Sequence, residues 1–507
     1  MPSSPLPSTR IRSALPMLGA AALLLAGCAV GPDYVRPDAP LSSTALQAFK
    51  EDGPWRAAAP ADIDPRTPWW TLYGDPELDA LVAQADAANQ TLQQAEAQYR
   101  QAQALVQSAS SAFYPTVGLD ASGGRGRSKN DGVSTLGNSH AWSLQASWEP
   151  DLWGRVRRTV EAANAGAQAS AADLAAARLG VQAAVVNNYI QLRLSDQQKA
   201  LYDNTLAGYR TSLQLSQAQY RAGVVMRSDV ALAQSTLAAA EAQAVDVELT
   251  RRQLEHALAV LVGKTPADFS VAPAPMAVKL PQVPTGVPSK LLERRPDIAS
   301  AERRAAAANA QIGVAQAAYY PDLLLSAAGG FSGAGLTSWA AAPDKVWALG
   351  FALAGTLFDG GQREAQTAQA RAGFDAAAAG YRQTVLAGFQ EVEDNLAALH
   401  QLAQAREAQQ RAVDAAHDSE RVLLSQYRAG TTTYLAVITS QALALSAERT
   451  SLLLQAREYA ASVALIKAVG GGWDASQMDN ATARAAAPGD HAANGAAATE
   501  RVAAAAR

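Results

Sequence analysis

Two stretches of the chain alternate apolar and polar or small residues with a period of two. From 142 to 149, Trp, Leu, Ala and Trp alternate with Ser, Gln, Ser and Glu. From 347 to 354, Trp, Leu, Phe and Leu alternate with Ala, Gly, Ala and Ala. This period predicts strands with one apolar face. A weaker stretch of the same kind precedes each one, so we predict strand pairs at about 116–150 and 322–357. In the first pair, the Gly, Ser, Asn and Asp residues at roughly 123–139 predict a loop between the two strands.

These strands have the dimensions of membrane strands. About 11 residues at ~3.3 Å each, tilted by ~45°, cross the apolar part of a bilayer. Trp142 and Trp148 in the first pair, Trp153 just beyond it, and Trp347 in the second pair predict an aromatic girdle at the membrane interfaces. A half-buried hairpin in a soluble domain gives the same period and remains an alternative.

Two proline-free stretches of equal length, 155–220 and 362–427, have helical spacing. Leu206, Tyr209 and Leu213 step by three and four residues, which is typical of a coiled-coil seam. At ~1.5 Å per residue each helix is ~100 Å long, too long for the core of a globular domain. Each is followed by a second helical stretch, so we predict two long helical hairpins, 155–262 and 362–470. An earlier helix is predicted to begin at Pro76, after Asp75 as its N-cap, and to continue to Phe113-Tyr114, where Pro115 ends it.

The chain contains an internal duplication. Tyr-Arg-Ala-Gly occurs at 220–223 and again at 427–430, and Ala257–Gly263 resembles Ala464–Gly470 in the same register. A period this long predicts a duplicated half-molecule rather than a short-period solenoid. The predicted organisation is a signal peptide 1–27, an extended segment 28–68, a first repeat 69–263, a proline-rich linker 264–288, a second repeat 289–473 and a disordered Ala-rich tail 474–507.

The N-terminus has the composition of a secretory signal. Arg10 and Arg12 precede an apolar stretch that ends in Leu-Ala-Gly-Cys at Cys28, the one cysteine of the chain. This resembles the lipobox of bacterial lipoproteins, which implies a lipid on Cys28; Ala29 after it favours sorting to the outer membrane. A plain secretory signal with an accidental cysteine is the alternative.

Composition excludes several classes of function. The net charge of −4 gives no basic field for nucleic acid. The five histidines are scattered, and neither they nor the carboxylates, which we interpret as solvated helix faces, have the spacing of a metal or catalytic site. We therefore expect no enzyme activity, no metal and no cofactor. No uninterrupted apolar run of about 18 residues follows Cys28, so we predict no transmembrane helix.

Four strands cannot close a barrel, and an open sheet edge is not tolerated in lipid. Several chains must therefore share one barrel. Two chains would give a barrel whose interior is filled by side chains, whereas three would give a twelve-stranded barrel with a lumen. The Gly, Ala, Ser and Thr residues on the second face suit passage of water.

The chain resembles the outer-membrane factors of the TolC type, in the NodT/OprM-like lipoprotein branch. The matching segments are the lipobox with 29–37, Trp69–Leu81, Leu291–Ile298, both Tyr-Arg-Ala-Gly motifs and Leu357–Gly361. The resemblance implies a mixed α and β membrane protein, a homotrimer with a shared twelve-stranded β-barrel above a periplasmic α-helical barrel. It implies the exit duct of a resistance-nodulation-division efflux system in the outer membrane, with a periplasmic adaptor and an inner-membrane pump as partners.

The resemblance also implies roles at the hairpin tips. Asp229 stands where relatives carry a gate aspartate, and we predict that Arg227 or Arg428 pairs with it; a helix cap is the alternative role. Tyr427 either closes the bore or packs the seam, and packing is the better interpretation. Thr439 replaces a second gate aspartate, so a second carboxylate ring is not expected. The positions expected to contact the adaptor are Arg221, Gly223, Arg428 and Gly430.

Two other functions share parts of this pattern. A type I secretion duct has the same fold with protein cargo, and the lipobox favours the efflux branch instead. A periplasmic adaptor also carries a lipobox and a long hairpin, but it has a β-rich module inserted in that hairpin. Here the duplicated hairpins follow Trp-marked strand pairs.

Overall fold

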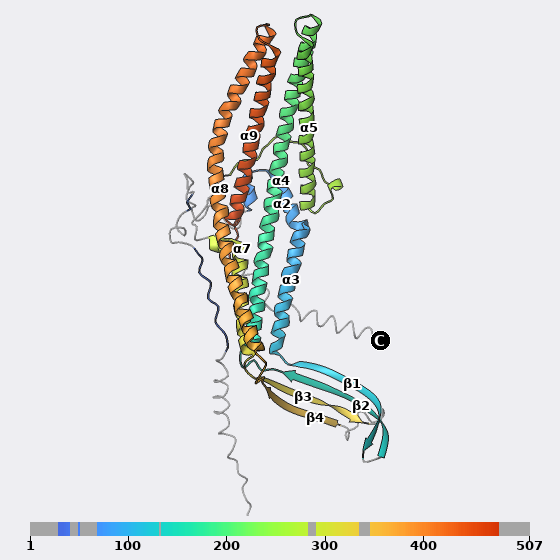
Figure 1. Ribbon diagram of the computed structural model, residues 1–507. Coiled ribbons are helices and arrows are strands. Elements are labelled where there is room, and N and C mark those ends of the chain that lie inside the picture. The colour runs from blue at the N-terminus through green and yellow to red at the C-terminus, as the bar shows by residue number, and fades with distance from the viewer. Residues whose placement is uncertain are drawn as a thin grey trace, which may run out of the picture. The chain divides into compact units, whose positions relative to one another are not determined.

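The computed structural model describes residues 29–40, 49–50, 68–130, 133–281, 291–333 and 345–475. Within them the chain is mostly helical, with one antiparallel sheet (Figure 1). The predicted signal peptide, Cys28 and most of the predicted tail lie outside the described residues. The first half contains η1 (Trp69–Tyr73), α2 (Pro76–Ala88), α3 (Gln90–Ser110), η2 (Ser111–Phe113), β1 (Thr116–Asn130), β2 (Val133–Trp148), α4 (Arg155–Arg221) and α5 (Arg227–Leu261). The second half contains η3 (Pro266–Asp268), α6 (Leu291–Arg294), α7 (Pro296–Ala317), β3 (Asp322–Gly333), β4 (Lys345–Ala354), α8 (Gln362–Arg428) and α9 (Tyr434–Ala468).

The long helices have equal lengths in the two halves. α4 and α8 have 67 residues each, and α5 and α9 have 35 each. The predicted proline-free helices are therefore confirmed to within one residue at the end of each. The most apolar 18-residue window of α4 has a mean hydropathy of 1.2, and 39% of it is buried. By length and composition alone, α4 is long and apolar enough to cross a membrane. A buried core helix of a soluble protein meets the same criterion, so this finding does not identify a membrane span.

The helix predicted to continue from Pro76 to Phe113 is interrupted, so that prediction is wrong. Asn89 leaves the helical conformation, with ψ at 126°. Its Oδ1 accepts hydrogen bonds from the N–H groups of Thr91 and Leu92 at 2.9 and 3.2 Å, which caps α3. Its Nδ2 donates to the carbonyl of Leu261 at 2.8 Å. Asn89 thereby fixes the end of α5 to the junction of α2 and α3.

The four strands form one antiparallel sheet in the order β1-β2-β3-β4 (Figure 1). The two predicted strand pairs are present, and β2 additionally pairs with β3 along 140–148, which joins the two halves. The loop predicted at 123–139 is wrong, because β1 and β2 remain paired as far as Asn130 and Val133. Ladder pairing depends on backbone hydrogen bonds, so it continues beyond the last apolar side chain.

The register divides the side chains of the sheet between two faces. Residues that oppose each other on neighbouring strands share a face, as do residues two apart on one strand. One face therefore connects Leu119 to Leu144 and, through Trp148, Leu325 to Phe351. We call this the apolar face: Val117, Leu119, Ala121, Trp142, Leu144, Ala146, Trp148, Leu323, Leu325, Ala327, Gly329, Phe331, Trp347, Leu349, Phe351 and Leu353. The polar face carries mainly Gly, Ala, Ser and Thr together with Asp120, Gln145 and Asp322, with Leu324 and Val346 as exceptions.

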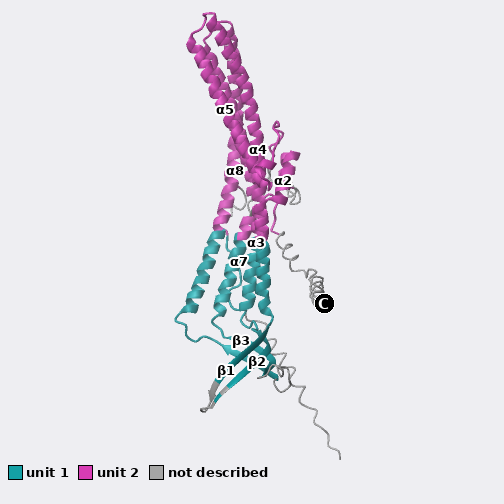
Figure 2. Ribbon diagram, turned by 90° about the vertical axis from the view of Figure 1, so that its right-hand side faces the viewer, with its two compact units in different colours: residues 1–38, 99–170, 301–381 teal, residues 39–98, 171–300, 382–507 magenta. Residues whose placement is uncertain are grey.

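The chain divides into two compact units, each drawn from both halves of the sequence (Figure 2). Unit 1 falls within residues 1–38, 99–170 and 301–381 and contains the sheet. Unit 2 falls within 39–98, 171–300 and 382–507 and contains the hairpin tips. The boundaries of the predicted repeats therefore differ from those of the compact units, because corresponding elements of the two repeats pack together.

Candidate functional site

The two Tyr-Arg-Ala-Gly motifs form the same hydrogen-bonded turn at the ends of α4 and α8. After α4, the N–H of Gly223 donates to the carbonyl of Tyr220 at 3.0 Å, and that of Val224 to Gln219 at 2.9 Å. After α8, Gly430 donates to Tyr427 and Thr431 to Gln426, both at 3.0 Å. This is a Schellman motif, which satisfies the last carbonyls of a helix.

Glycine is required in both turns by backbone conformation. Gly223 and Gly430 both have φ at 75°, in the left-handed region. A Cβ added at either position would meet no atom within 4 Å, so close packing is not the reason for glycine. Within one chain, the predicted adaptor-contact residues Arg221, Gly223, Arg428 and Gly430 are all exposed at these turns. Their contact with an adaptor remains a prediction.

Asp229 lies in the first turn of α5, next to the first tip. One of its carboxylate oxygens accepts a hydrogen bond from the N–H of Met226 at 3.3 Å, which is half of a capping box. Among the ion pairs within the described residues, none joins Asp229 to Arg227 or Arg428, and both arginines are exposed. The corresponding first-turn position of α9 is Ala436, so only one tip carries this carboxylate.

Tyr427 packs inside the tip of its own chain. Its side chain is buried, and its ring lies 5.3 Å from that of Tyr434. Its hydroxyl donates to Gln219 and lies 3.4 Å from the hydroxyl of Ser216. Burial raises the pKa of Tyr434 to about 12, so this ring stays neutral at physiological pH. The geometry supports the packing role, and closure of a bore by Tyr427 remains a prediction.

The predicted girdle residues occupy different levels of the sheet. Trp148 donates its Nε1–H to the carbonyl of Phe113 at 3.0 Å, where the strands meet the helices. Trp153 follows β2, and its ring stacks on Tyr320 at 4.8 Å. Trp142 lies six residues before Trp148 in β2, farther from the helices, and its ring packs on that of Phe331 at 5.2 Å. Trp347 is 73% exposed on the apolar face. The positions suit a girdle, whose contact with lipid remains a prediction.

The segment that follows Cys28 is bound along unit 1, a feature that the sequence did not predict. The N–H of Val30 donates to the carbonyl of Trp153 at 3.0 Å. Arg158 donates to the carbonyls of Val30 and Gly31 and to Asp33, the last at 2.9 Å. Farther along the segment, the Tyr34 hydroxyl donates to the carboxylate of Glu302 in α7 at 2.6 Å. The Arg36 side chain donates to the hydroxyl of Tyr381 in α8 at 3.2 Å. The segment therefore begins beside the junction of β2 and α4 and crosses from there to α8.

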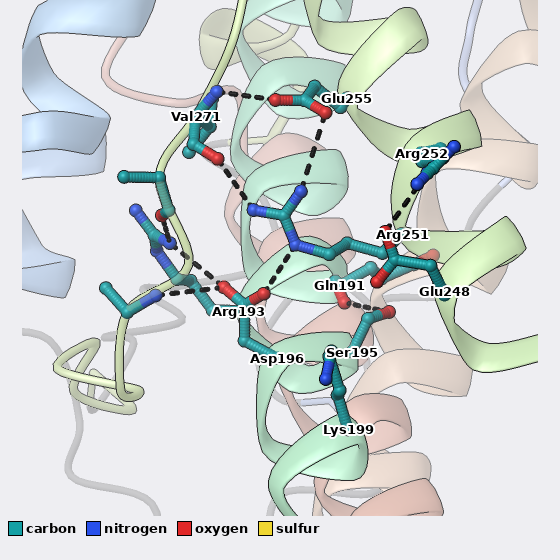
Figure 3. Close-up of polar contacts among 12 residues, drawn as sticks. Gln191, Arg193, Ser195, Asp196, Lys199, Glu248, Arg251, Arg252, Glu255 and Val271 are labelled. Atoms are coloured by element: carbon teal, nitrogen blue, oxygen red, sulfur yellow. Dashed lines mark hydrogen bonds and ion pairs between the residues drawn. The ribbon is translucent and has the colours of Figure 1, made fainter. Parts of the chain in front are cut away.

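A buried ion network in unit 2 fixes the segment between the repeats (Figure 3). The Asp196 carboxylate accepts from Arg193 of α4 at 3.0 Å and from Arg251 of α5 at 2.6 Å. These three side chains are 2 to 7% exposed. The two arginines also donate to the carbonyls of Ala272 and Val271, at 2.7 and 2.6 Å. Asp196 and Arg251 are thus interior groups, and the prediction that carboxylates on the long helices are solvated is wrong at Asp196.

No catalytic arrangement is present among the described residues. Asp196 and Glu77 are engaged by arginine. No group of three His, Cys, Asp or Glu side chains in this part of the chain could hold a metal ion. A groove of about 580 Å³ in unit 1 is lined by small and amide side chains, with Arg155 as its one charged residue. Glu149 binds that arginine at 2.6 Å.

A sheet with one exposed apolar face, joined to helices ~100 Å long, defines a channel-type membrane protein. A family model described as outer membrane efflux protein matches residues 81–264 and 287–471. The chain therefore belongs to the outer membrane efflux protein family. This is a family of transport ducts in the outer membrane rather than of enzymes.

Individual relatives agree with the family assignment. A pyoverdine export outer membrane protein, OpmQ of Pseudomonas putida, is 33% identical over 82% of this chain and 91% of its own length. The solved outer-membrane channel OprN is 31% identical with a TM-score of 0.81, covering 88% of this chain and 100% of that chain. The CmeC channel of Campylobacter jejuni has a TM-score of 0.82 at 24% identity, covering 92% and 100%, and supports the fold alone. The predicted fold family and outer-membrane location are confirmed.

Proposed function

We propose that this protein is the exit duct of a tripartite resistance-nodulation-division efflux system. The observation that carries the proposal is the four-stranded sheet with two unpaired edges and one exposed apolar face. In lipid, every strand edge must be paired. Sheets from several chains would pair edge to edge and close into one barrel. The lumen of that barrel would continue between the helical hairpins, which gives a duct.

The oligomer that fits is a homotrimer formed from an internally duplicated chain. Three chains would contribute twelve strands, a number that leaves a lumen, whereas two would give a filled interior. The polar face, with its Gly, Ala, Ser and Thr residues, would line that lumen. The equal lengths of α4 and α8 would bring both kinds of tip to the same end of a helical barrel.

The partners are proposed from the relatives and from the tips. OpmQ is named for pyoverdine export, and other relatives for toluene or solvent efflux pumps, which supports an assembly with a pump and an adaptor. The exposed tips at Arg221 and Arg428 are the surfaces proposed for the adaptor. The cargo of this chain would be a small molecule delivered by the pump.

A lipid on Cys28 is proposed as a second membrane anchor, with no other cofactor. Ala29 lies against Gly154, so that a Cβ added to Gly154 would be 2.9 Å from the Cα of Ala29. The described segment therefore starts beside the end of β2, where an anchor on the preceding residue could reach the membrane. Mass spectrometry of the mature N-terminal peptide should find an acylated Cys28, and an unmodified peptide that starts elsewhere would exclude the anchor.

The duct proposal is tested by mass and by conductance. Native mass spectrometry in detergent should give a trimer, and the same preparation should form discrete channels in planar bilayers. A monomer or dimer as the only species, or a trimer that never conducts, would contradict the duct. The acylation result is independent, because the sheet could insert without the lipid.

A further inference from the structure

The cationic residues of the sheet lie on one face only. Among the strand residues whose side chains are described, the Lys and Arg residues are Arg125, Arg127 and Lys345, all at apolar-face positions of the register. The acidic residues of those strands, Asp120 and Asp322, occupy the polar face. Positive charge is therefore continuous with the apolar surface and separated from the proposed lumen.

These cations lie at one end of the apolar face. Lys345 opposes Phe331, and Phe331 opposes Trp142, so Lys345 is level with the last aromatic pair. Arg125 lies four residues beyond Ala121, the partner of Trp142 on β1. At ~3.3 Å per residue and a tilt of ~45°, this places the backbone of Arg125 ~9 Å and that of Arg127 ~14 Å above that level, so each side chain would reach the lipid phosphates by extending back toward the apolar face. The head-group region on one side of a bilayer is ~5–8 Å thick.

The side chains of Arg125 and Arg127 are available to a ligand. Both are exposed, and no carboxylate in the described part of the chain forms an ion pair with them. Arginine binds phosphate oxygens through paired hydrogen bonds from its planar guanidinium. This end of the sheet is the one remote from the helices, so in the proposed duct it faces the exterior.

We propose that Arg125 and Arg127 bind the phosphorylated head groups of lipids in the outer leaflet. The inference rests on the proposed function, since it requires the apolar face to contact the membrane. A soluble anion is disfavoured because the charges follow directly on the apolar surface, where lipid phosphates lie at a fixed depth. The hairpin beyond the membrane would then anchor the barrel to its surrounding lipid.

The sequence Gly124-Arg125-Gly126-Arg127 offers a matched control. Exchanging each pair (Gly124→Arg with Arg125→Gly, and Gly126→Arg with Arg127→Gly) keeps composition and net charge but moves both charges to the polar face. A Cβ at Gly126 would meet nothing within 4 Å, and one at Gly124 would lie 3.3 Å from the Ser139 hydroxyl. The exchange therefore fits, with a small shift of that hydroxyl.

The test measures binding of bisphosphorylated lipid A to the full-length oligomer in detergent. The wild type should bind it more tightly than fully dephosphorylated lipid A. The double variant Arg125→Gln, Arg127→Gln should lose about 30-fold in affinity, at roughly 5-fold per charge near a lipid surface. The exchanged variant should lose as much, although its net charge is unchanged.

Three results would overturn the proposal. The first is unchanged lipid A binding by the double variant, and the second is wild-type lipid A binding by the exchanged variant. The third is that millimolar inorganic phosphate weakens lipid A binding of the wild type as much as loss of the two arginines does. The last would indicate a soluble-phosphate site. Each oligomer is also tested for channels in planar bilayers: conducting trimers without lipid A selectivity reject only this inference, whereas failure to form channels rejects the duct and the inference with it.

Discussion

Gly430 shows how a single residue fixes the tip of a helical hairpin. Its φ of 75° costs an L-residue about 1–2 kcal/mol. We expect Gly430→Ala to lower the unfolding free energy by about that amount. Gly208→Ala is the control, because Gly208 is exposed in the body of α4 and alanine there should stabilise by about 0.5–1 kcal/mol. Chemical unfolding of the two variants should shift in opposite directions, and equal shifts would contradict the conformational explanation.

Glu458 makes the stability of the fold depend on pH. It is 4% exposed in α9, and burial raises the pKa of its carboxyl, an effect that Arg406 at 3.5 Å opposes. The folded state therefore keeps this proton to a higher pH than the unfolded state, whose Glu pKa is about 4.3. Stability from this group is highest below pH 4.3 and is lost as pH rises through the folded pKa.

The expected result for Glu458→Gln is a higher thermal midpoint at pH 7.5 than wild type and a smaller fall between pH 4.5 and 7.5. Glu407→Gln, at an exposed position on α8, should follow the wild-type curve. Thermal unfolding of the detergent-solubilised oligomer at both pH values measures this. A variant curve parallel to that of the wild type would refute the assignment.

At the scale of elements, the Asp196 network holds α4, α5 and the inter-repeat segment together. Removal of its central charge by Asp196→Asn leaves two buried arginines without their shared carboxylate, which typically costs 3–5 kcal/mol. Asp203→Asn breaks an exposed pair with Lys199 and should cost less than about 1 kcal/mol. Denaturant midpoints compare the two variants, and similar losses would mean that the network is not the main attachment of the segment.

The strand elements can be tested by a pair of neighbouring residues. Leu349 is 75% exposed on the apolar face, and Ala348 belongs to the polar face. Arginine facing lipid near the middle of a bilayer costs about 2–4 kcal/mol. Leu349→Arg should therefore reduce the yield of membrane-inserted oligomer well below that of Ala348→Arg. Membrane fractionation measures the yield, and equal insertion of the two variants would show that the apolar face does not meet lipid.

The sequence predicted the elements whose signal is local. The strands around Trp142 and Trp347 alternate in hydrophobicity because one side of the sheet is apolar, and the Tyr-Arg-Ala-Gly turns require glycine. The paired hairpin beyond Gly123 was missed because alternating Gly and Arg carries no hydrophobic signal. Asp196 was misread because its buried partners include the Arg251 side chain and the backbone N–H of Ala274, both far along the chain.

At the scale of the whole molecule, the two repeats have equal lengths but different chemistry. The first carries the Asp196 network and Asp229 at its tip, whereas the second has Glu458 at the position aligned with Arg251 and Ala436 at the position aligned with Asp229. In the proposed trimer, one ring of three carboxylates would therefore form at the tips. Because the long helices of the two repeats are equally long, both kinds of hairpin would end at the same level of the duct. Because Asp229 has no counterpart at Ala436, the charged gate would involve only the first hairpin.

That gate yields the last prediction. Like charges 4 Å apart repel by ~1 kcal/mol in water and by more where water is scarce. A closed ring of Asp229 therefore needs cations, and the exposed Arg227 and Arg428 at the tips are the candidates. Neither arginine forms an ion pair with Asp229 among the described residues of one chain, so we expect the pairing to occur between chains. Arg428→Ala or Arg227→Ala should raise single-channel conductance in planar bilayers. Asp229→Ala should weaken cation selectivity.

The helix-cap role of Asp229 can be separated from its charge. Asp229→Asn keeps an oxygen that can accept the Met226 N–H, so it should preserve the thermal midpoint while it removes the negative charge. A charged gate requires Asn and Ala to reduce cation selectivity equally. If Asp229→Asn conducts and selects as the wild type does, and only Asp229→Ala changes the protein by lowering its midpoint, then Asp229 caps α5 and no carboxylate ring controls the duct.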